Sequence, residues 1–115
     1  MEIKVQLSVL DVEQLRDATM DDESLMRDVV AALIDDTARH IGLLDRAIRE
    51  RDAGETMRLA HCSKGACASV GASSSAAVLL EIESKAATGD FETCGKSLRS
   101  LAEELDKLRS EASTI

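Results

Sequence analysis

Apolar residues recur every three or four positions along the last part of the chain. Steps of three and four keep side chains on one face of an α-helix, so this pattern predicts an amphipathic helix from Phe91 to Ala112. The same seam fits a coiled-coil dimer, although packing against other helices of the same chain is more economical. The seam consists of Phe91, Cys94, Leu98, Leu101, Leu105, Leu108 and Ala112.

The longest amphipathic pattern lies nearer the N-terminus. Asp21 or Asp22 can cap the start of this helix by accepting hydrogen bonds from free backbone N–H groups, and the helix is expected to reach about Arg51. The sequence Asp52-Ala53-Gly54 is then expected to interrupt it. Its inward positions are Val30, Leu33, Ile34, Thr37, Ile41, Leu44 and Ile48.

Two shorter helices are predicted between these two. The first runs from about Glu55 to Val70 and ends at Gly71, because glycine readily adopts the left-handed conformation that terminates helices. Residues 73–75 are serines that can cap the second helix, and a Thr-Gly-Asp turn at residues 88–90 ends it. The inward positions of the second helix are Leu79, Ile82 and Ala86.

The N-terminal region carries weaker patterns. Asp11 and Gln14 have the spacing of a capping box, which predicts a short helix to about Asp17. Apolar residues alternate with polar ones over residues 1–8, which predicts an extended tail that lies on the helices. A short edge strand or a non-native extension is the alternative for this tail.

Composition favours a single domain of closely packed helices. The chain has 115 residues, which is the size of one domain, and residues 1–115 are treated as one. It contains no proline, and Phe91 is its sole aromatic residue. A core of aliphatic residues, alanine and methionine suits helices better than a β-sandwich.

Charge and cysteine content narrow the classes of partner and of compartment. The net charge of −8 disfavours binding to nucleic acid or to an anionic membrane, so the expected partner is a protein. The longest apolar run, residues 76–80, is too short to span a membrane, so the chain is expected to be soluble and cytoplasmic. Cys62, Cys67 and Cys94 have no metal-binding or disulfide pattern and are expected to be reduced.

The most informative group of residues lies in the helix predicted from Glu55 to Val70. His61, Lys64 and Gly65 have the i, i+3 and i+4 spacing that places side chains on one helix face, and this face points away from the apolar positions. A lone helix histidine is most often a solvated side chain. However, glycine inside a helix costs about 1 kcal/mol relative to alanine, so Gly65 needs a reason. The reason we infer is that the missing side chain leaves space beside His61 for another protein.

This sequence, His-x-x-Lys-Gly with a second glycine at position 71, resembles the signature of histidine-containing phosphotransfer (HPt) domains. The Ile82-Glu83 pair and the turn at residues 88–90 are also similar to segments of that family, whereas Ser63 stands where these domains usually carry a large apolar residue. The resemblance implies an all-α fold, an antiparallel four-helix bundle with an additional short N-terminal helix. It also implies that the active histidine is exposed in the middle of one helix.

The resemblance further implies a role for each residue of the motif. His61 would accept a phosphoryl group from a receiver-domain aspartate and pass it to another receiver, without kinase activity of its own. Lys64 would stabilise the phosphoryl charge, and Gly65 would give the receiver room to approach. Arg58, one turn before His61, either assists or is simply solvated. No metal or cofactor is expected on this chain, since the Mg²⁺ belongs to the receiver.

Other functions remain open from the sequence. The first is a non-catalytic helical module that binds a receiver or a sensor kinase without accepting phosphate. The second is a homodimeric coiled-coil adaptor, although a monomer is expected. The initiator methionine favours a free-standing protein over a domain of a hybrid kinase.

Overall fold

Five α-helices make up the computed structural model, which describes residues 7–115 and contains no strand in that range. The all-helical fold expected from the sequence is therefore confirmed, and most of the predicted N-terminal tail lies outside the described residues. None of these helices is long and apolar enough to cross a membrane. They are α1 (Val12–Ala18), α2 (Glu23–Arg49), α3 (Ala53–Val70), α4 (Ser73–Ala87) and α5 (Phe91–Ala112).

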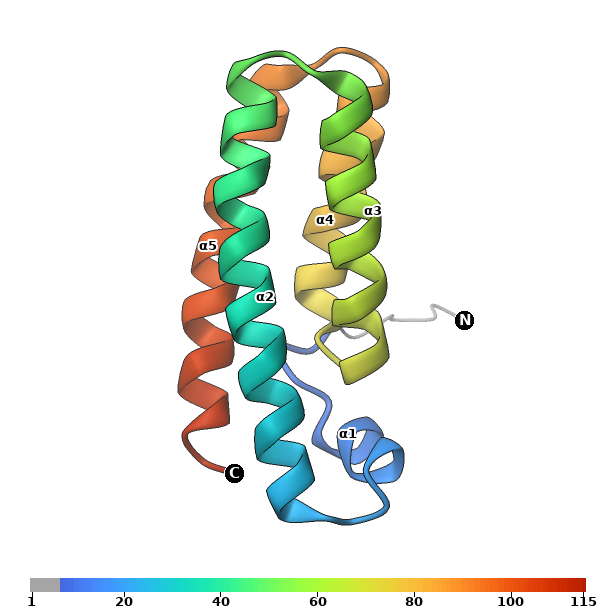
Figure 1. Ribbon diagram of the computed structural model, residues 1–115, viewed down its shortest axis with the longest axis vertical. Coiled ribbons are helices and arrows are strands. Elements are labelled where there is room, and N and C mark those ends of the chain that lie inside the picture. Colours follow the sequence, from blue (N-terminus) through green and yellow to red (C-terminus); the bar gives the residue numbers. More distant parts are fainter. Residues whose placement is uncertain (1–6) are drawn as a thin grey trace, which may run out of the picture.

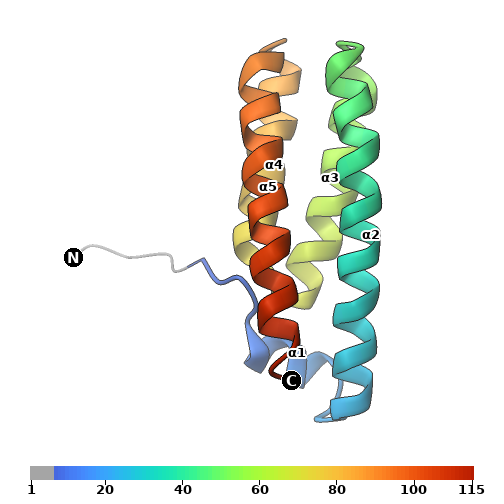
Figure 2. The ribbon, with the colours of Figure 1, turned by 90° about the vertical axis from the view of Figure 1, so that its left-hand side faces the viewer.

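The four long helices surround a common core (Figures 1 and 2). Helix α2 packs against α3 and α5, and α4 packs against the same two helices. The core is aliphatic, as the composition predicts, and so its stability rests on burial of branched side chains and methionine. Its largest fully buried apolar residues are Leu15, Met26, Val30, Leu44, Leu79, Ile82, Leu101 and Leu108.

Two helix starts differ from the sequence predictions. Helix α3 begins at Ala53 rather than Glu55, because the Asp52 carboxylate accepts a hydrogen bond from Glu55 N at 3.1 Å and makes the expected break the first turn. No serine caps α4. Residues 73–75 lie inside its first turn, and Ser74 N donates instead to the carbonyl oxygen of Ser8 at 2.9 Å.

The reversal between α3 and α4 depends on Gly71. This residue has a φ of +95°, and the hydrogen bonds Gly71 N to Ala68 O and Ala72 N to Cys67 O form a Schellman motif. The motif ends α3 at the predicted residue. It turns the chain so that α4 returns alongside α3.

The segment around α1 holds this turn in place (Figure 1). Asp11 N donates to the carbonyl oxygen of Gly71 at 2.8 Å, and Asp11 also caps α1 by accepting from Gln14 N. The predicted capping box is incomplete, because the Gln14 amide donates to Ala68 O at 2.8 Å instead of returning to Asp11. Leu15 of α1 is fully buried and fills the end of the core.

Gly71→Ala should lower the free energy of unfolding by about 2 kcal/mol. An L-residue in the left-handed region costs about 1–2 kcal/mol, and the added Cβ would lie 2.9 Å from the backbone oxygen of Asp11. Gly95→Ala is the matched control, because Gly95 lies inside α5 and a Cβ added there would meet nothing within 4 Å. The free energy of unfolding of this control, measured with urea, should be higher than that of wild type by up to about 1 kcal/mol. Equal stability of Gly71→Ala and the wild type would contradict this view of the turn.

Candidate functional site

Helices α3 and α4 bring His61 into contact with Glu83. The Nδ1 atom of His61 lies 2.9 Å from Oε2 of Glu83, although 22 residues separate them in sequence. His61 lies eleven residues before Ala72 and Glu83 lies eleven residues after it. Two antiparallel helices that start from one turn place such equidistant residues at the same level. The turn at Gly71 therefore determines this contact.

The second oxygen of the same carboxylate binds Lys64. Lys64 Nζ donates to Glu83 Oε1 at 2.7 Å, so one carboxylate bridges two residues of the predicted motif. The side chain of Glu83 is 20% exposed and that of Lys64 is 26% exposed, whereas the side chain of His61 is 71% exposed. The bridge is therefore mostly sheltered, while the imidazole reaches into solvent.

These hydrogen bonds determine the protonation of the site. The bond from Lys64, followed by that from His61, lowers the pKa of Glu83 against the opposing effect of burial. Glu83 is therefore ionised at neutral pH, and an ionised carboxylate can only accept hydrogen bonds. It follows that Nδ1 of His61 carries a proton and donates it. In the neutral ring this leaves a free lone pair on Nε2.

Gly65 lies on the exposed side of α3, one turn beyond His61. A Cβ added at this position would meet nothing within 4 Å. Packing within the chain therefore does not require a glycine here. The open space is consistent with the expectation that another molecule approaches this surface.

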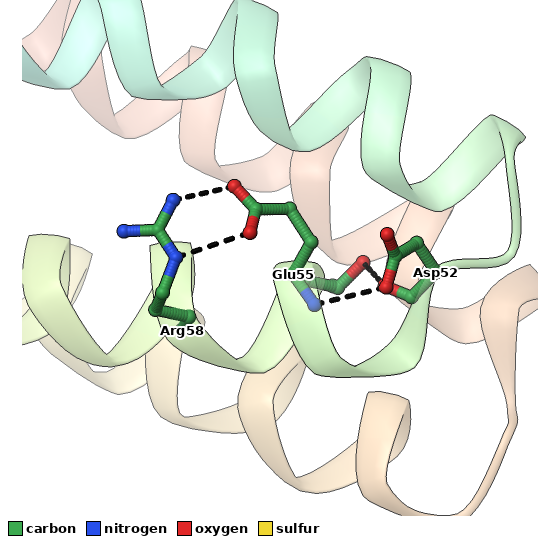
Figure 3. Close-up of polar contacts among 4 residues, drawn as sticks. Asp52, Glu55 and Arg58 are labelled. Carbon is green, nitrogen blue, oxygen red and sulfur yellow. Dashed lines mark hydrogen bonds and ion pairs between the residues drawn. The ribbon is translucent and has the colours of Figure 1, made fainter.

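The structure does not bring Arg58 to His61. Arg58 Nε donates to Glu55 Oε2 at 3.0 Å and its Nη2 donates to the other carboxylate oxygen, as Figure 3 shows. Both residues lie on the surface of α3, near the Asp52 cap. Of the two alternatives left by the sequence, the geometry favours an exposed surface arginine, because its nearest acidic partner is on its own helix.

Small side chains lie beneath the exposed face of α3. Ser63 and Cys67 are buried, and Cys67 Sγ lies 3.9 Å from Thr37 Oγ1 of α2. Burial raises the pKa of the Cys67 thiol, which keeps it protonated. Ser63, the departure from the HPt pattern, is therefore a small core residue between α3 and its neighbours. Cys62 is exposed, and all three cysteines are free.

Glu83 is named in the sequence only as part of the family-like Ile82-Glu83 pair, and its role at the site is not predicted there. Its side chain belongs to a different helix, so no spacing within α3 indicates it. The signal that could have found it is its distance from the turn, which equals that of His61. Within residues 7–115, no three histidine, cysteine or acidic side chains are grouped so as to hold a metal ion.

Comparisons with known proteins identify the family and the fold of this chain. A family model described as "Hpt domain" matches residues 28–111. The fold is similar to histidine-containing phosphotransfer protein B from Pseudomonas aeruginosa PAO1, with a TM-score of 0.85 and 20% identity over 95% of each chain. It is also similar to a rice protein assigned to the histidine-containing phosphotransfer proteins, with a TM-score of 0.82 and 21% identity over 93% of this chain and 79% of that one. A search of curated proteins finds no match.

Glu83→Ala should destabilise the protein at neutral pH but not in acid. Folding lowers the pKa of Glu83. The ionised carboxylate therefore contributes fully to the free energy of unfolding above the pKa of the unfolded state, which is about 4.3. The contribution is lost as the pH falls through the lower pKa of the folded state. Two charge-assisted hydrogen bonds at a partly exposed position should contribute about 1 kcal/mol to the free energy of unfolding.

Urea unfolding at pH 7 and at pH 3 measures this effect. The gap between wild type and Glu83→Ala should narrow at the lower pH. Glu81→Ala is the control, because Glu81 is an exposed acidic residue of the same helix. A gap that stays constant with pH would show that Glu83 stabilises by packing rather than by charge.

Proposed function

Because the chain belongs to the Hpt domain family, we propose that it is a phosphorelay intermediate that accepts a phosphoryl group on His61 from a receiver-domain aspartate and passes it to another receiver. The family assignment confirms the resemblance seen in the sequence, and with it a phosphotransfer role in two-component signalling. The observation that carries the proposal is the exposed imidazole of His61, whose Nδ1 is held by Glu83.

In this proposal Nε2 of His61 is the nucleophile. Its lone pair attacks the phosphorus of the aspartyl phosphate, the new N–P bond forms, and the carboxylate of the receiver leaves with the electrons of the P–O bond. Such a reaction depends mainly on positioning and on stabilisation of charge. Mg²⁺ would be supplied by the receiver, and this chain would need no cofactor of its own.

Lys64 has two tasks in this mechanism. In the free protein it holds the Glu83 carboxylate in place. The incoming phosphoryl group adds about two negative charges, and the Lys64 ammonium, one turn from His61, is the cation available to stabilise them. This refines the expectation from the sequence, which assigned Lys64 to the phosphoryl group alone.

The receiver would dock on the α3–α4 face around His61. Gly65 leaves open space on this face, and Leu80, which is 50% exposed, lies one turn before Glu83 on α4. An exposed leucine beside a reactive side chain suits a protein interface. Gly65 and Leu80 would therefore contact the receiver.

Charge on α3 and α4 favours the same face. Although the whole chain carries a net charge of −8, the charged residues of these two helices cancel. An incoming aspartyl phosphate therefore meets a surface without excess negative charge. The basic residues are Arg58, Lys64 and Lys85, and the acidic residues are Glu55, Glu81 and Glu83.

The phosphorelay intermediate would be a monomeric helical bundle in the cytoplasm. Helices α2–α5 would form the antiparallel four-helix bundle of the family, with α1 as the additional helix, and the protein would act as a monomer. It would act in the cytoplasm, where free thiols such as its three cysteines persist.

His61→Gln should abolish phosphate uptake. The protein is incubated with a phosphorylated cognate receiver, and the transferred label should be labile in acid and stable in base. His40→Gln is the control and should behave as wild type, because His40 binds the Asp36 carbonyl of its own helix and lies outside this face. A label that persists in His61→Gln would refute the assignment. A receiver that binds without transferring phosphate would support the non-catalytic module instead.

Gly65→Gln should separate docking from folding. A side chain at this position meets open space, so its melting temperature should be no lower than that of wild type. The same side chain would occupy the space of the docked receiver, and a displacement of about 1 Å can slow transfer on the order of 100-fold. Thermal melts and transfer rates are measured on one preparation, with Gly95→Gln on α5 as the control. Normal transfer by Gly65→Gln would remove the steric argument.

A further inference from the structure

An apolar groove lies between the N-terminal half of α2 and the C-terminal end of α5. Its volume of about 310 Å³ falls within the range of small-molecule sites, roughly 300–1,000 Å³. Figure 2 shows these two helices side by side at the front, with α3 and α4 behind them. The groove is therefore separate from the His61 site, which α3 and α4 form. Its apolar lining residues are Val30, Ala31, Ile34, Ala112 and Ile115.

The wall of this groove is continuous with the apolar core. Val30 is buried in the core, and the other apolar lining residues, except the exposed Ala31, are half-buried against it. An aliphatic chain that lies along this wall removes apolar surface of both partners from water, and that transfer is favourable. The wall thus favours an apolar ligand without specific hydrogen bonds.

Two arginines complete the lining of the groove. Arg27 Nη1 donates to the carbonyl oxygen of Ile115 at 3.4 Å, and no acidic side chain of residues 7–115 lies within ion-pair distance of Arg27. A guanidinium group has five N–H donors, so Arg27 keeps donors for a further acceptor. Arg109 pairs with Asp106 of its own helix at 3.2 Å. Such exposed pairs contribute little, so a ligand can compete for Arg109 as well.

The charge of this lining is opposite to that of the chain. The described residues that line the groove include two arginines and no acidic residue, whereas the chain has a net charge of −8. An anionic group therefore meets a locally favourable potential here. A guanidinium group binds a carboxylate through two parallel hydrogen bonds, which makes a carboxylate the best matched anion.

We propose that this groove binds an aliphatic carboxylate, a molecule of the fatty-acid class, with its chain on the apolar wall and its carboxylate at Arg27. Ile115 makes a contact of the same kind within the chain, because its side chain packs on the core and its carbonyl oxygen accepts from Arg27. A carboxylate accepts more strongly than a carbonyl oxygen, since it is ionised. This inference is independent of phosphotransfer by His61.

The lining does not suit ligands with many polar groups. The Ser113 hydroxyl donates to the carbonyl oxygen of Ser110 at 2.6 Å, which leaves the two guanidinium groups as the side-chain donors for a ligand. A nucleotide or a sugar would bury polar groups without partners against the apolar wall, and each such group costs binding energy. A small inorganic anion would make no use of the wall.

NMR titration with octanoate tests the proposal, at concentrations below those at which octanoate forms micelles. The amide signals of Ala31, Ile34 and Ala112 should shift and saturate. Those of Gly65 and Glu81, on the α3–α4 side, should not move. Octanol and octyltrimethylammonium carry the same chain with a neutral and a positive head group. Octanoate should bind about tenfold more tightly than octanol, and the cation more weakly still. Equal affinity for octanoate and octanol would overturn the proposal.

Two pairs of variants separate the charge from the wall. Arg27→Gln should weaken octanoate binding about tenfold and leave octanol binding unchanged. Arg99→Gln is its control, because Arg99 is an exposed arginine of α5 outside the groove. Ala31→Met should abolish binding of both ligands by filling the groove, and Ala32→Met is its control on the other side of α2. Both alanines are exposed, so melting temperatures should stay at the wild-type value.

Other occupants of the groove give different results. A helical peptide rich in glutamate and leucine that shifts the groove signals, where octanoate does not, would overturn the proposal in favour of a protein partner. Vesicles of phosphatidylglycerol should not bind the protein, because its net charge is −8. Vesicle binding without octanoate binding would indicate a membrane surface and would also overturn the proposal. Phosphate uptake by His61 is measured on the same preparation, so failure of either inference is seen separately.

Discussion

The double hydrogen bond of the Glu83 carboxylate is the interaction on which the site depends. The carboxylate on α4 accepts from Lys64 of α3 through one oxygen and from His61 of α3 through the other. The bond to His61 places the proton of the imidazole on Nδ1. Without it, His61 would be an exposed side chain with no defined orientation. With it, one ring nitrogen is anchored and the other is presented to solvent. The orientation of His61 thus follows from a tertiary contact rather than from its own helix.

That contact has its own requirement, which is the turn at Gly71. His61 and Glu83 meet because one reversal joins α3 to α4, so a change in the turn by one residue would rotate one helix relative to the other by about 100° and separate the two side chains. Hydrogen bonds from Asp11 and Gln14 reinforce the turn from the N-terminal side. The residues before α2, which lie outside the family match, therefore support the geometry of the site.

The sequence predicts the elements well and the contacts between them less well. Periodicity predicts α5 to its observed ends at Phe91 and Ala112, because a mostly polar helix with one apolar seam has a single stable orientation. Gly71 predicts the end of α3 for a different local reason, which is that glycine readily adopts the left-handed conformation that ends a helix. The predicted serine cap of α4 is wrong, because Ala72 is the N-cap residue, and Ser74 N in the first turn donates to the carbonyl oxygen of Ser8, a distant part of the chain.

In the candidate site, too, residues on one helix can be predicted from the sequence, and contacts between helices cannot. His61, Lys64 and Gly65 can be found from their spacing, because all three lie on one helix. Glu83 cannot be found in that way, since only the packing of α3 on α4 brings it to His61. Arg58 lies three residues from both Glu55 and His61 on the same helix, and it pairs with Glu55. Pairing between charged residues is a competition that spacing alone does not decide.

The most direct test of this account is to identify which ring nitrogen carries the phosphoryl group. The protein labelled with nitrogen-15 is charged by a phosphorylated receiver, and the coupling between phosphorus and nitrogen is measured by NMR. The account predicts that the phosphoryl group is on Nε2 of His61 and that Nδ1 retains its proton. A phosphoryl group on Nδ1, or on any other residue, would contradict it.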